Sequence, residues 1–260
     1  MVAQPRALRR PGATAVGAFG LLLVVATPCV AYEVAAVQDG GTVTGTVKFV
    51  GTPPKLEPIP VNKNRDVCGE HKPAEALILS AERGVKGSVV LIEGVAHGKK
   101  GGGEVVLDNN QCVFVSHVTA VGLKDKVAIR NSDPILHNTH GFLGTPTVFN
   151  VALPTKGQVI EVTKYLKTQG VIRVLCDAHP HMSAWMIVHD SPYFAVTDDK
   201  GAFRITDVPP GTYKVTMWHA GFRPKGADKD GRPVYDEPRT VTRELTVAPK
   251  ATATVDFELK

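Results

Sequence analysis

Seven consecutive residues, Cys176-Asp177-Ala178-His179-Pro180-His181-Met182, most constrain what this chain can fold into. They carry a thiol, two imidazoles and a thioether, which are all donors to soft or borderline metal ions. Three donors on so short a segment are useful only if the loop is anchored at the end of a rigid strand. Two His, one Cys and a weak axial Met are the ligand set of copper electron-transfer sites, so the pattern predicts a copper ion.

The second His has to come from another strand end, so that the ion is fixed against a rigid frame. His137 lies 39 residues before Cys176 and follows a predicted strand at 126–130 and a turn at 131–134. Two loops at one end of a β-sandwich would then close around a single ion. The expected ligands are His137, Cys176, His179 and Met182.

A second spacing, Cys176-x4-His181-x4-Met186, offers His181 and Met186 as alternative ligands. The shorter loop favours His179 and Met182, because Pro180 then lies between rigid ligands, but both assignments stay open. Zinc could also bind Cys and His, whereas the thioether favours copper.

The cysteine count is consistent with a metal-bound thiol. Residues 1–31 resemble a secretory signal peptide, with Arg6, Arg9 and Arg10 before an apolar stretch and a small-residue cleavage site before Tyr32. We therefore expect a bacterial protein that is periplasmic or secreted. The apolar run is too short for a confident membrane span, so no stable span is expected after cleavage, with an uncleaved anchor as the alternative.

Removal of this leader takes away Cys29 and leaves Cys68, Cys112 and Cys176. Exported proteins usually oxidise their cysteines in pairs, so parity predicts a Cys68–Cys112 disulfide. An odd thiol in a secreted protein needs an explanation, and metal ligation of Cys176 supplies one.

Charge gives little information about partners. The formal net charge of +5 falls to +2 without the three leader arginines, which leaves 27 basic and 25 acidic residues. No basic run interleaved with aromatic residues is present, so the sequence gives no support for a nucleic-acid role. An oxygen-reducing copper enzyme needs further His-x-His pairs, whereas the single pair here lies within the ligand loop, so we expect no enzyme activity.

Short runs of alternating apolar and polar residues between turn residues predict an all-β chain. Strands at Val85–Ile92 and Glu104–Leu107 are expected to flank a flexible hairpin tip at the glycines 101–103. The expected organisation is an N-terminal β extension at 32–84 with half of the disulfide, a copper sandwich at 85–190 and a small β-sandwich at 191–260.

The residues Asn131, His137-Asn138 and Cys176-x-x-His179-x-x-Met182 resemble the cupredoxins, the blue-copper proteins that include amicyanin and plastocyanin. The resemblance covers roughly residues 85–190 and implies a Greek-key β-sandwich with one type 1 copper. It also implies imidazole ligation by both histidines, thiolate ligation by Cys176 and axial binding by Met182. Asn138 would hydrogen-bond between the two ligand loops, and a redox partner protein would exchange electrons with the copper.

The C-terminal segment resembles the carboxypeptidase regulatory-like, transthyretin-type sandwich. The resemblance rests on Gly201-Ala202-Phe203 and Pro209-Pro210-Gly211-Thr212-Tyr213. It implies a rigid accessory domain, and the zinc-peptidase motif HExxH is absent. Thr42-x-x-Gly45-x-Val47 weakly resembles a first strand of the same domain type, with its pairing left open. The combination is similar to bacterial proteins labelled as methylamine-utilisation proteins.

Three functions are compatible with these patterns. The leading hypothesis is an exported blue-copper protein that transfers single electrons. The second is a copper store or chaperone that uses the same ligands. The third is a non-metal adhesion or carbohydrate-binding module in which the thiol and the imidazoles are incidental.

Overall fold

The computed structural model describes Met1 and residues 32–260. The predicted leader, including Cys29, lies outside the described residues apart from Met1. The described chain is built almost entirely of strands, with one short helix and one 3-10 turn, which confirms the all-β prediction. The short helix is α1 (Arg65–Cys68), and the 3-10 turn is η1 (Thr163–Tyr165). No helix of the described residues has the length and apolar character needed to cross a membrane.

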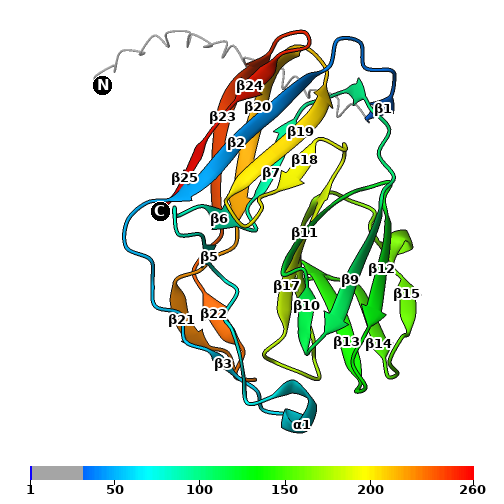
Figure 1. Ribbon diagram of the computed structural model, residues 1–260, viewed down its shortest axis with the longest axis vertical. Helices are drawn as coiled ribbons and strands as arrows, with labels where there is room; N and C mark the ends of the chain where they lie inside the picture. Colours follow the sequence, from blue (N-terminus) through cyan, green and yellow to red (C-terminus); the bar gives the residue numbers. More distant parts are fainter. Residues whose placement is uncertain (2–31) are drawn as a thin grey trace. The chain divides into compact units, whose positions relative to one another are not determined.

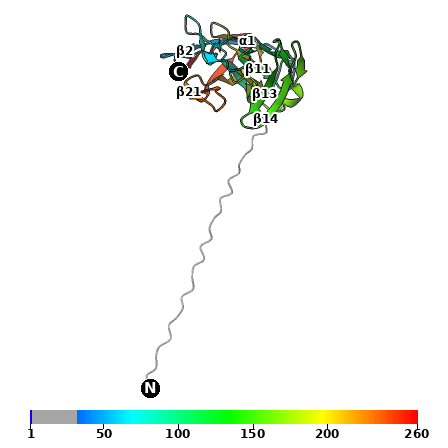
Figure 2. The same ribbon diagram turned by 90° about the horizontal axis from the view of Figure 1, so that it is seen from below.

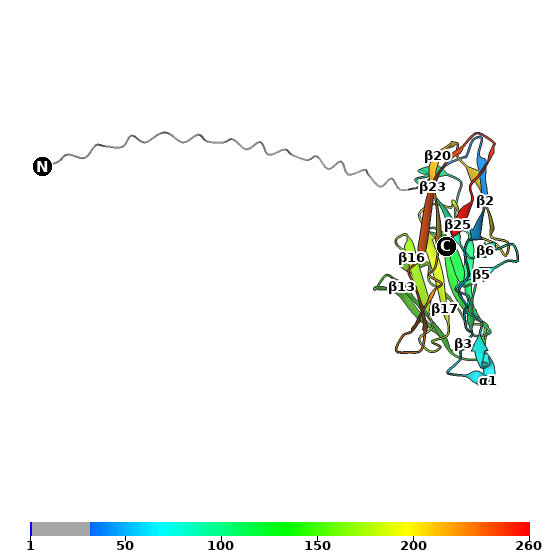
Figure 3. The ribbon, with the colours of Figure 1, turned by 90° about the vertical axis from the view of Figure 1, so that its left-hand side faces the viewer.

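The first β-sandwich consists of two sheets with strand orders β10-β9-β12-β15 and β11-β17-β16-β13-β14. In the second sheet, β13 pairs with β14, both labelled in Figure 2, and β16 pairs with β17, both labelled in Figure 3. The bounds of the first sheet are β9 (Glu104–Asn110), β10 (Val113–Val115), β12 (Lys126–Asn131) and β15 (Val159–Glu161). Those of the second are β11 (Val118–Gly122), β13 (His137–Leu143), β14 (Thr147–Leu153), β16 (Gly170–Leu175) and β17 (Ser183–His189).

Period-two alternation explains how these strands build a core. In β12, Val127, Ile129 and Asn131 are buried while Lys126 and Arg130 face solvent. Successive side chains of a strand point to opposite faces, so one face of β12 packs inward. The core cluster of this sandwich also contains the predicted ligands Cys176 and Met182. The site is therefore embedded in the apolar core.

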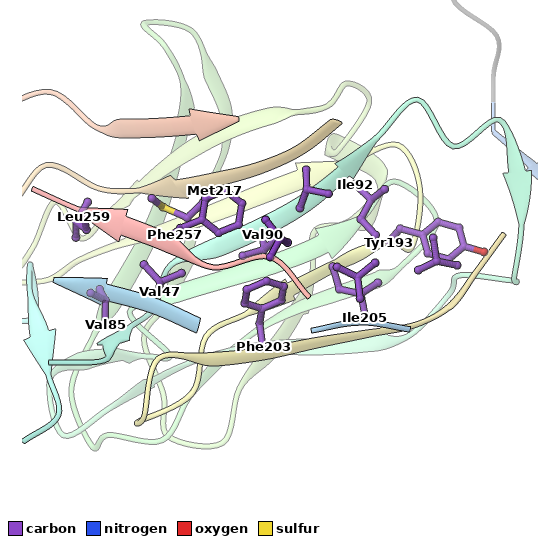
Figure 4. Close-up of a cluster of buried hydrophobic side chains, with 14 of the residues drawn as sticks. Val47, Val85, Val90, Ile92, Tyr193, Phe203, Ile205, Met217, Phe257 and Leu259 are labelled. Carbon is purple, nitrogen blue, oxygen red and sulfur yellow. The ribbon is translucent and has the colours of Figure 1, made fainter. Parts of the chain in front are cut away.

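The second sandwich has sheets ordered β18-β7-β20-β23 and β19-β2-β24, with β25 also pairing with β2 (Figure 1). Side chains such as Val90, Phe203 and Met217 pack in the space between them (Figure 4). The first sheet contains β7 (Val89–Glu93), β18 (Phe194–Val196), β20 (Gly211–His219) and β23 (Arg239–Val247). The other contains β2 (Gly41–Phe49), β19 (Ala202–Val208), β24 (Thr252–Thr254) and β25 (Phe257–Leu259).

Small two-stranded sheets complete the described chain. They pair β1 with β8, β3 with β4, β5 with β6 and β21 with β22. Their bounds are β1 (Glu33–Val34), β8 (His97–Gly98), β3 (Ile59–Pro60), β4 (His71–Lys72), β5 (Ile78–Leu79), β6 (Val85–Lys86), β21 (Pro224–Ala227) and β22 (Pro233–Tyr235).

The predicted hairpin around the glycines 101–103 is wrong. The segment Val85–Ile92 is interrupted at Gly87, whose φ of +80° lies in the left-handed region. Its second part, β7, pairs with β18 and β20 in the second sandwich, whereas β9 pairs with β10 and β12 in the first. Val89 and Val90 are both fully buried, because β7 is covered on both faces.

The expected boundary at residue 85 therefore does not separate the two sandwiches. The strand that contains Thr42–Val47, left unassigned by sequence, pairs with β19, β24 and β25 of the second sandwich. Strands β2 and β7 precede the first sandwich in the chain, and β18 to β25 follow it. The first sandwich is thus inserted within the second.

A third apolar cluster joins the two sandwiches. Trp185 of β17 and Trp218 of β20 meet edge to face with ring centroids 5.6 Å apart. Val89 and Ile187 are buried in the same cluster. An edge-to-face pair of aromatic rings stabilises a contact beyond the effect of the apolar area that it buries.

We expect stability to fall with acidification below about pH 6.5 because of His117 and His219. Burial lowers the pKa of each to about 4. In the unfolded chain both titrate near about 6.5, so between these values the unfolded state binds more protons and folding weakens as pH falls. Urea midpoints measured from pH 8 to pH 4 test this. His219→Gln should flatten the profile, whereas a change at exposed His97 should not; equal slopes for the two variants would contradict the assignment.

Candidate metal centre

Three buried donors meet at one end of the first sandwich. His137 begins β13, Cys176 directly follows β16, and His179 lies in the loop between β16 and β17. One ligand atom from each lies within 4.8 Å of the others. Cys176 Sγ and His179 Nδ1 are 3.6 Å apart. Because β13 and β16 are antiparallel neighbours, the loop before one strand meets the loop after the other.

His137 is fully buried and has one ring nitrogen unused. Its Nε2 lies 2.9 Å from Asp133 Oδ2, while its Nδ1 has no hydrogen-bond partner within the described chain. A buried polar atom without a partner costs about 1–3 kcal/mol. Metal-binding histidines usually donate their second ring nitrogen to a carboxylate or carbonyl. The Asp133 contact leaves Nδ1 with its lone pair, so His137 fits a metal ligand.

His179 shows the same division of roles. Its Nε2 is 3.0 Å from Asn64 Oδ1, and its Nδ1 faces Cys176. Burial lowers the pKa of His137, and burial with the nearby His137 and His181 lowers the pKa of His179 to about 4. Both rings are therefore neutral at pH 7, as metal ligation requires. Burial raises the pKa of Cys176, so the sulfur carries its proton until a metal replaces it.

Met182 and Met186 differ in their place along the chain, one at the end of the ligand loop and the other within a strand. Met182 closes the ligand loop: its N–H donates to His179 O at 2.9 Å, and its carbonyl accepts from Cys176 N–H at 3.3 Å. Its side chain and that of Met186 are both buried in the same cluster as Cys176. Met186 lies within β17, opposite Ile172. Met186 lies four residue steps after Met182, which is roughly 13 Å along an extended chain.

His181 lies beside the donor group but is not part of it. Its ring centroid is 5.6 Å from that of His179, and 6% of the residue is exposed. Both ring nitrogens are buried and have no hydrogen-bond partner among residues 32–260. Burial lowers its pKa to about 4, with a further contribution from Lys72.

Asn138 connects the two ligand loops. Its Oδ1 accepts from Asp177 N–H at 2.7 Å and Ala178 N–H at 3.2 Å, and the Cys176 thiol donates to the same oxygen at 3.5 Å. Its Nδ2 donates to Asp177 Oδ2 at 2.9 Å. This is the bridging position that the sequence resemblance implied for Asn138.

Sequence reasoning named Asn131 in the motif without giving it a role, and it missed Asp133, Asn64 and Arg232. Asn131 holds the turn before His137 by donating to the carbonyls of Ile135 and Leu153, and its Oδ1 accepts from Asp133 N–H. The turn pattern at 131–134 could have indicated Asp133 as a local acceptor. Asn64 and Arg232 come from distant segments that carry no such signal.

The structure contains a Cys68–Cys112 disulfide, and Cys176 is the free thiol of the described residues. The bond ties α1 to the turn between β9 and β10. Asn64, which contacts His179, is the residue before α1. At the other end of the bond, Cys112 N–H donates to Asp133, which contacts His137. The disulfide therefore fastens the supports of both histidines to each other.

Residues 186–260 match the family model of the carboxypeptidase regulatory-like domain. Among solved structures, the chain is similar to a copper-containing nitrite reductase from Thermus scotoductus SA-01, with 17% identity and a TM-score of 0.29, over 33% of this chain and 22% of that one. An oxidised amicyanin mutant has 25% identity and a TM-score of 0.28, over 34% of this chain and 83% of that one. A reduced amicyanin mutant has 21% identity and a TM-score of 0.29, over 45% and 95%. No curated protein matches the chain.

We expect the variant Cys68→Ala/Cys112→Ala to lose up to about 4 kcal/mol of unfolding free energy, from the chain entropy of a loop with a sequence separation of 44 residues. Urea denaturation of the oxidised wild type and the variant measures this. The single variant Cys176→Ala is the control, because it removes a thiol without opening a crosslink. A double variant as stable as the oxidised wild type would contradict the expectation.

Proposed function

We propose that this is an exported electron-transfer protein that binds one copper ion through His137, Cys176, His179 and Met182. The observation that carries the proposal is the unpartnered, fully buried Nδ1 of His137 beside a free buried thiol and a second oriented imidazole. A thiolate, two imidazoles and a thioether are the donors that favour copper over zinc. Metal binding would replace the thiol proton and satisfy the orphaned nitrogen.

Copper, when bound, would supply a one-electron redox couple. The residues of this chain would hold the ligands in one arrangement. Asp133 and Asn64 each fix one imidazole through its second nitrogen, and Asn138 ties the loop of His137 to that of Cys176. Complete burial of Cys176 and His137 excludes water from the donors. A buried and rigidly supported set of this kind suits electron transfer with a partner protein better than open metal exchange.

One observation favours a second candidate, the transfer or storage of copper. His181 offers two buried ring nitrogens without partners, close to His179. A spare imidazole of this kind could receive the metal as it enters or leaves. A non-metal binding module, by contrast, leaves the orphaned nitrogens of both His137 and His181 without explanation.

The ligand assignment predicts a visible spectrum. Copper added to the purified protein should give an intense thiolate-to-copper charge-transfer band, at one copper per chain. Cys176→Ser should abolish the band, and His179→Ala should remove or strongly change it. His181→Ala is the matched control in the same loop and should leave it intact. A band that survives Cys176→Ser, or that depends on His181 and not His179, would refute this ligand set.

The two candidate functions differ in how His181→Ala behaves. For electron transfer, the variant should keep reversible oxidation and reduction without loss of metal. For copper transfer, it should slow the movement of copper to a competing chelator. Met186→Leu provides a buried control outside the loop, and Met182→Leu should change the potential because it removes the thioether. Repeated redox cycles that release copper from the wild type would exclude the electron-transfer assignment.

A further inference from the structure

Arg232 reaches the ligand loop from the two-stranded β21-β22 sheet, which lies in the chain between β20 and β23 of the second sandwich. It lies between β21 and β22, and only 8% of the residue is exposed. Its Nη1 donates to the carbonyls of Pro180 and Met182, both at 2.8 Å, and its Nη2 donates to the carbonyl of Cys176 at 3.1 Å. One guanidinium thus contacts the first, fifth and last residues of the seven-residue loop.

Asp228 holds Arg232 in place. The backbone N–H of Arg232 donates to Asp228 Oδ1 at 2.9 Å, and its Nε lies 3.9 Å from Asp228 Oδ2. The same carboxylate accepts from Asp230 N–H and so shapes the turn. Asp228 fixes both the turn and the direction of the side chain.

A buried guanidinium needs a compensating set of acceptors. Removal of a charge from water is expensive unless the group is paired and hydrogen-bonded. Burial lowers the pKa of Arg232, yet the group keeps its charge at neutral pH. Three directed bonds to loop carbonyls, together with Asp228, provide that compensation. Lysine could not reproduce them, because only arginine offers several donors in a planar fork.

The loop carries few internal bonds of its own. Its two ends are joined by the Cys176 N–H bond to Met182 O, and His179 O accepts from Met182 N–H. Pro180 has no N–H to contribute. The fork of Arg232 adds three bonds to the loop carbonyls, and these bonds reach both ends of the loop.

We infer that Arg232 is a positioning residue that holds the ligand loop in its metal-binding shape, and that the β21-β22 sheet, which connects β20 to β23, acts on the metal centre through it. The inference deepens the proposed copper function and rests on it for the consequences at the metal. The loop-holding role itself concerns the metal-free protein. The fixed positive charge beside Cys176 also favours the less positive, reduced state of a bound metal ion.

The first test uses the metal-free full chain in a Cys29→Ser background, so that Cys176 is the reactive thiol. Labelling by a thiol reagent reports how often the loop opens. Arg232→Met should label about tenfold faster or more, because it loses charged hydrogen bonds to buried carbonyls. The labelling rate of Arg232→Lys should lie between those of wild type and Arg232→Met. Lys229→Met removes an exposed charge from the same turn and should match wild type. Wild-type labelling rates in Arg232→Met would overturn the inference.

Global unfolding has to be separated from loop opening. Urea midpoints are measured for each variant, and Asp228→Asn gives a second perturbation that leaves the guanidinium present. Faster labelling of Arg232→Met under conditions where the chain is fully folded supports the inference, as does a smaller increase for Asp228→Asn. Labelling rates that simply follow the urea midpoints across all variants would show a general loss of stability and would refute a positioning role.

The second test uses the copper-loaded protein. Arg232→Met should release copper to a chelator about tenfold faster, and its midpoint potential should fall because a positive charge is lost. Arg232→Lys should recover the potential but not the retention. If the midpoint potential of Lys229→Met fell as far as that of Arg232→Met, loss of any nearby positive charge would explain the change. That result would overturn an effect specific to the position of Arg232. Failure of the wild type to bind copper would remove the proposed function, while the thiol-labelling result would still decide whether Arg232 holds the loop.

Discussion

The antiparallel pairing of β13 with β16 is the interaction on which the metal centre depends. His140 lies opposite Leu175 in this register, so the start of β13 and the end of β16 lie at the same end of the sheet. That register brings His137 and Cys176 together, and the pairing of His137 with Leu153 of β14 also holds the start of β13. A slip by one residue would turn every side chain of the strand to the other face. Asn138 reinforces the register from outside the ladder, because its Oδ1 accepts two N–H groups of the opposite loop.

Each support of the centre satisfies a buried polar group and orients a donor at the same time. Asp133 accepts from the backbone at Gln111 and Cys112 and still contacts His137 Nε2. Asn64 accepts from His179 in the same way, directly before a helix that the disulfide ties to the Cys112 turn. Removal of either partner would leave a buried group unpaired. Stability of the fold and readiness of the donors are therefore coupled, because both rest on the same hydrogen bonds.

Sequence reasoning succeeded where the signal was local. Alternation within β12, the spacing of the donors around Cys176 and the Asn138 neighbour of His137 are all readable over a few residues. It failed where strand partners are distant. The glycines 101–103 suggested a hairpin, but β7 pairs with β20, more than a hundred residues away. Asn64 and Arg232 contact the loop from 115 and 50–56 residues away. No periodicity in the sequence encodes such contacts, because tertiary packing alone creates them.

The insertion of one sandwich within the other gives the appended strands a direct role in the centre. Strands β2 and β7 need β19, β20, β24 and β25 as partners, and without them Val43, Val47, Val90 and Ile92 would lose the core that buries them. The chain before the inserted sandwich provides Asn64, and the chain after it provides Arg232. Both therefore approach the donors from segments that flank the inserted sandwich in the sequence. The metal centre therefore draws on more of the chain than the inserted sandwich, because two of its supports lie outside that sandwich.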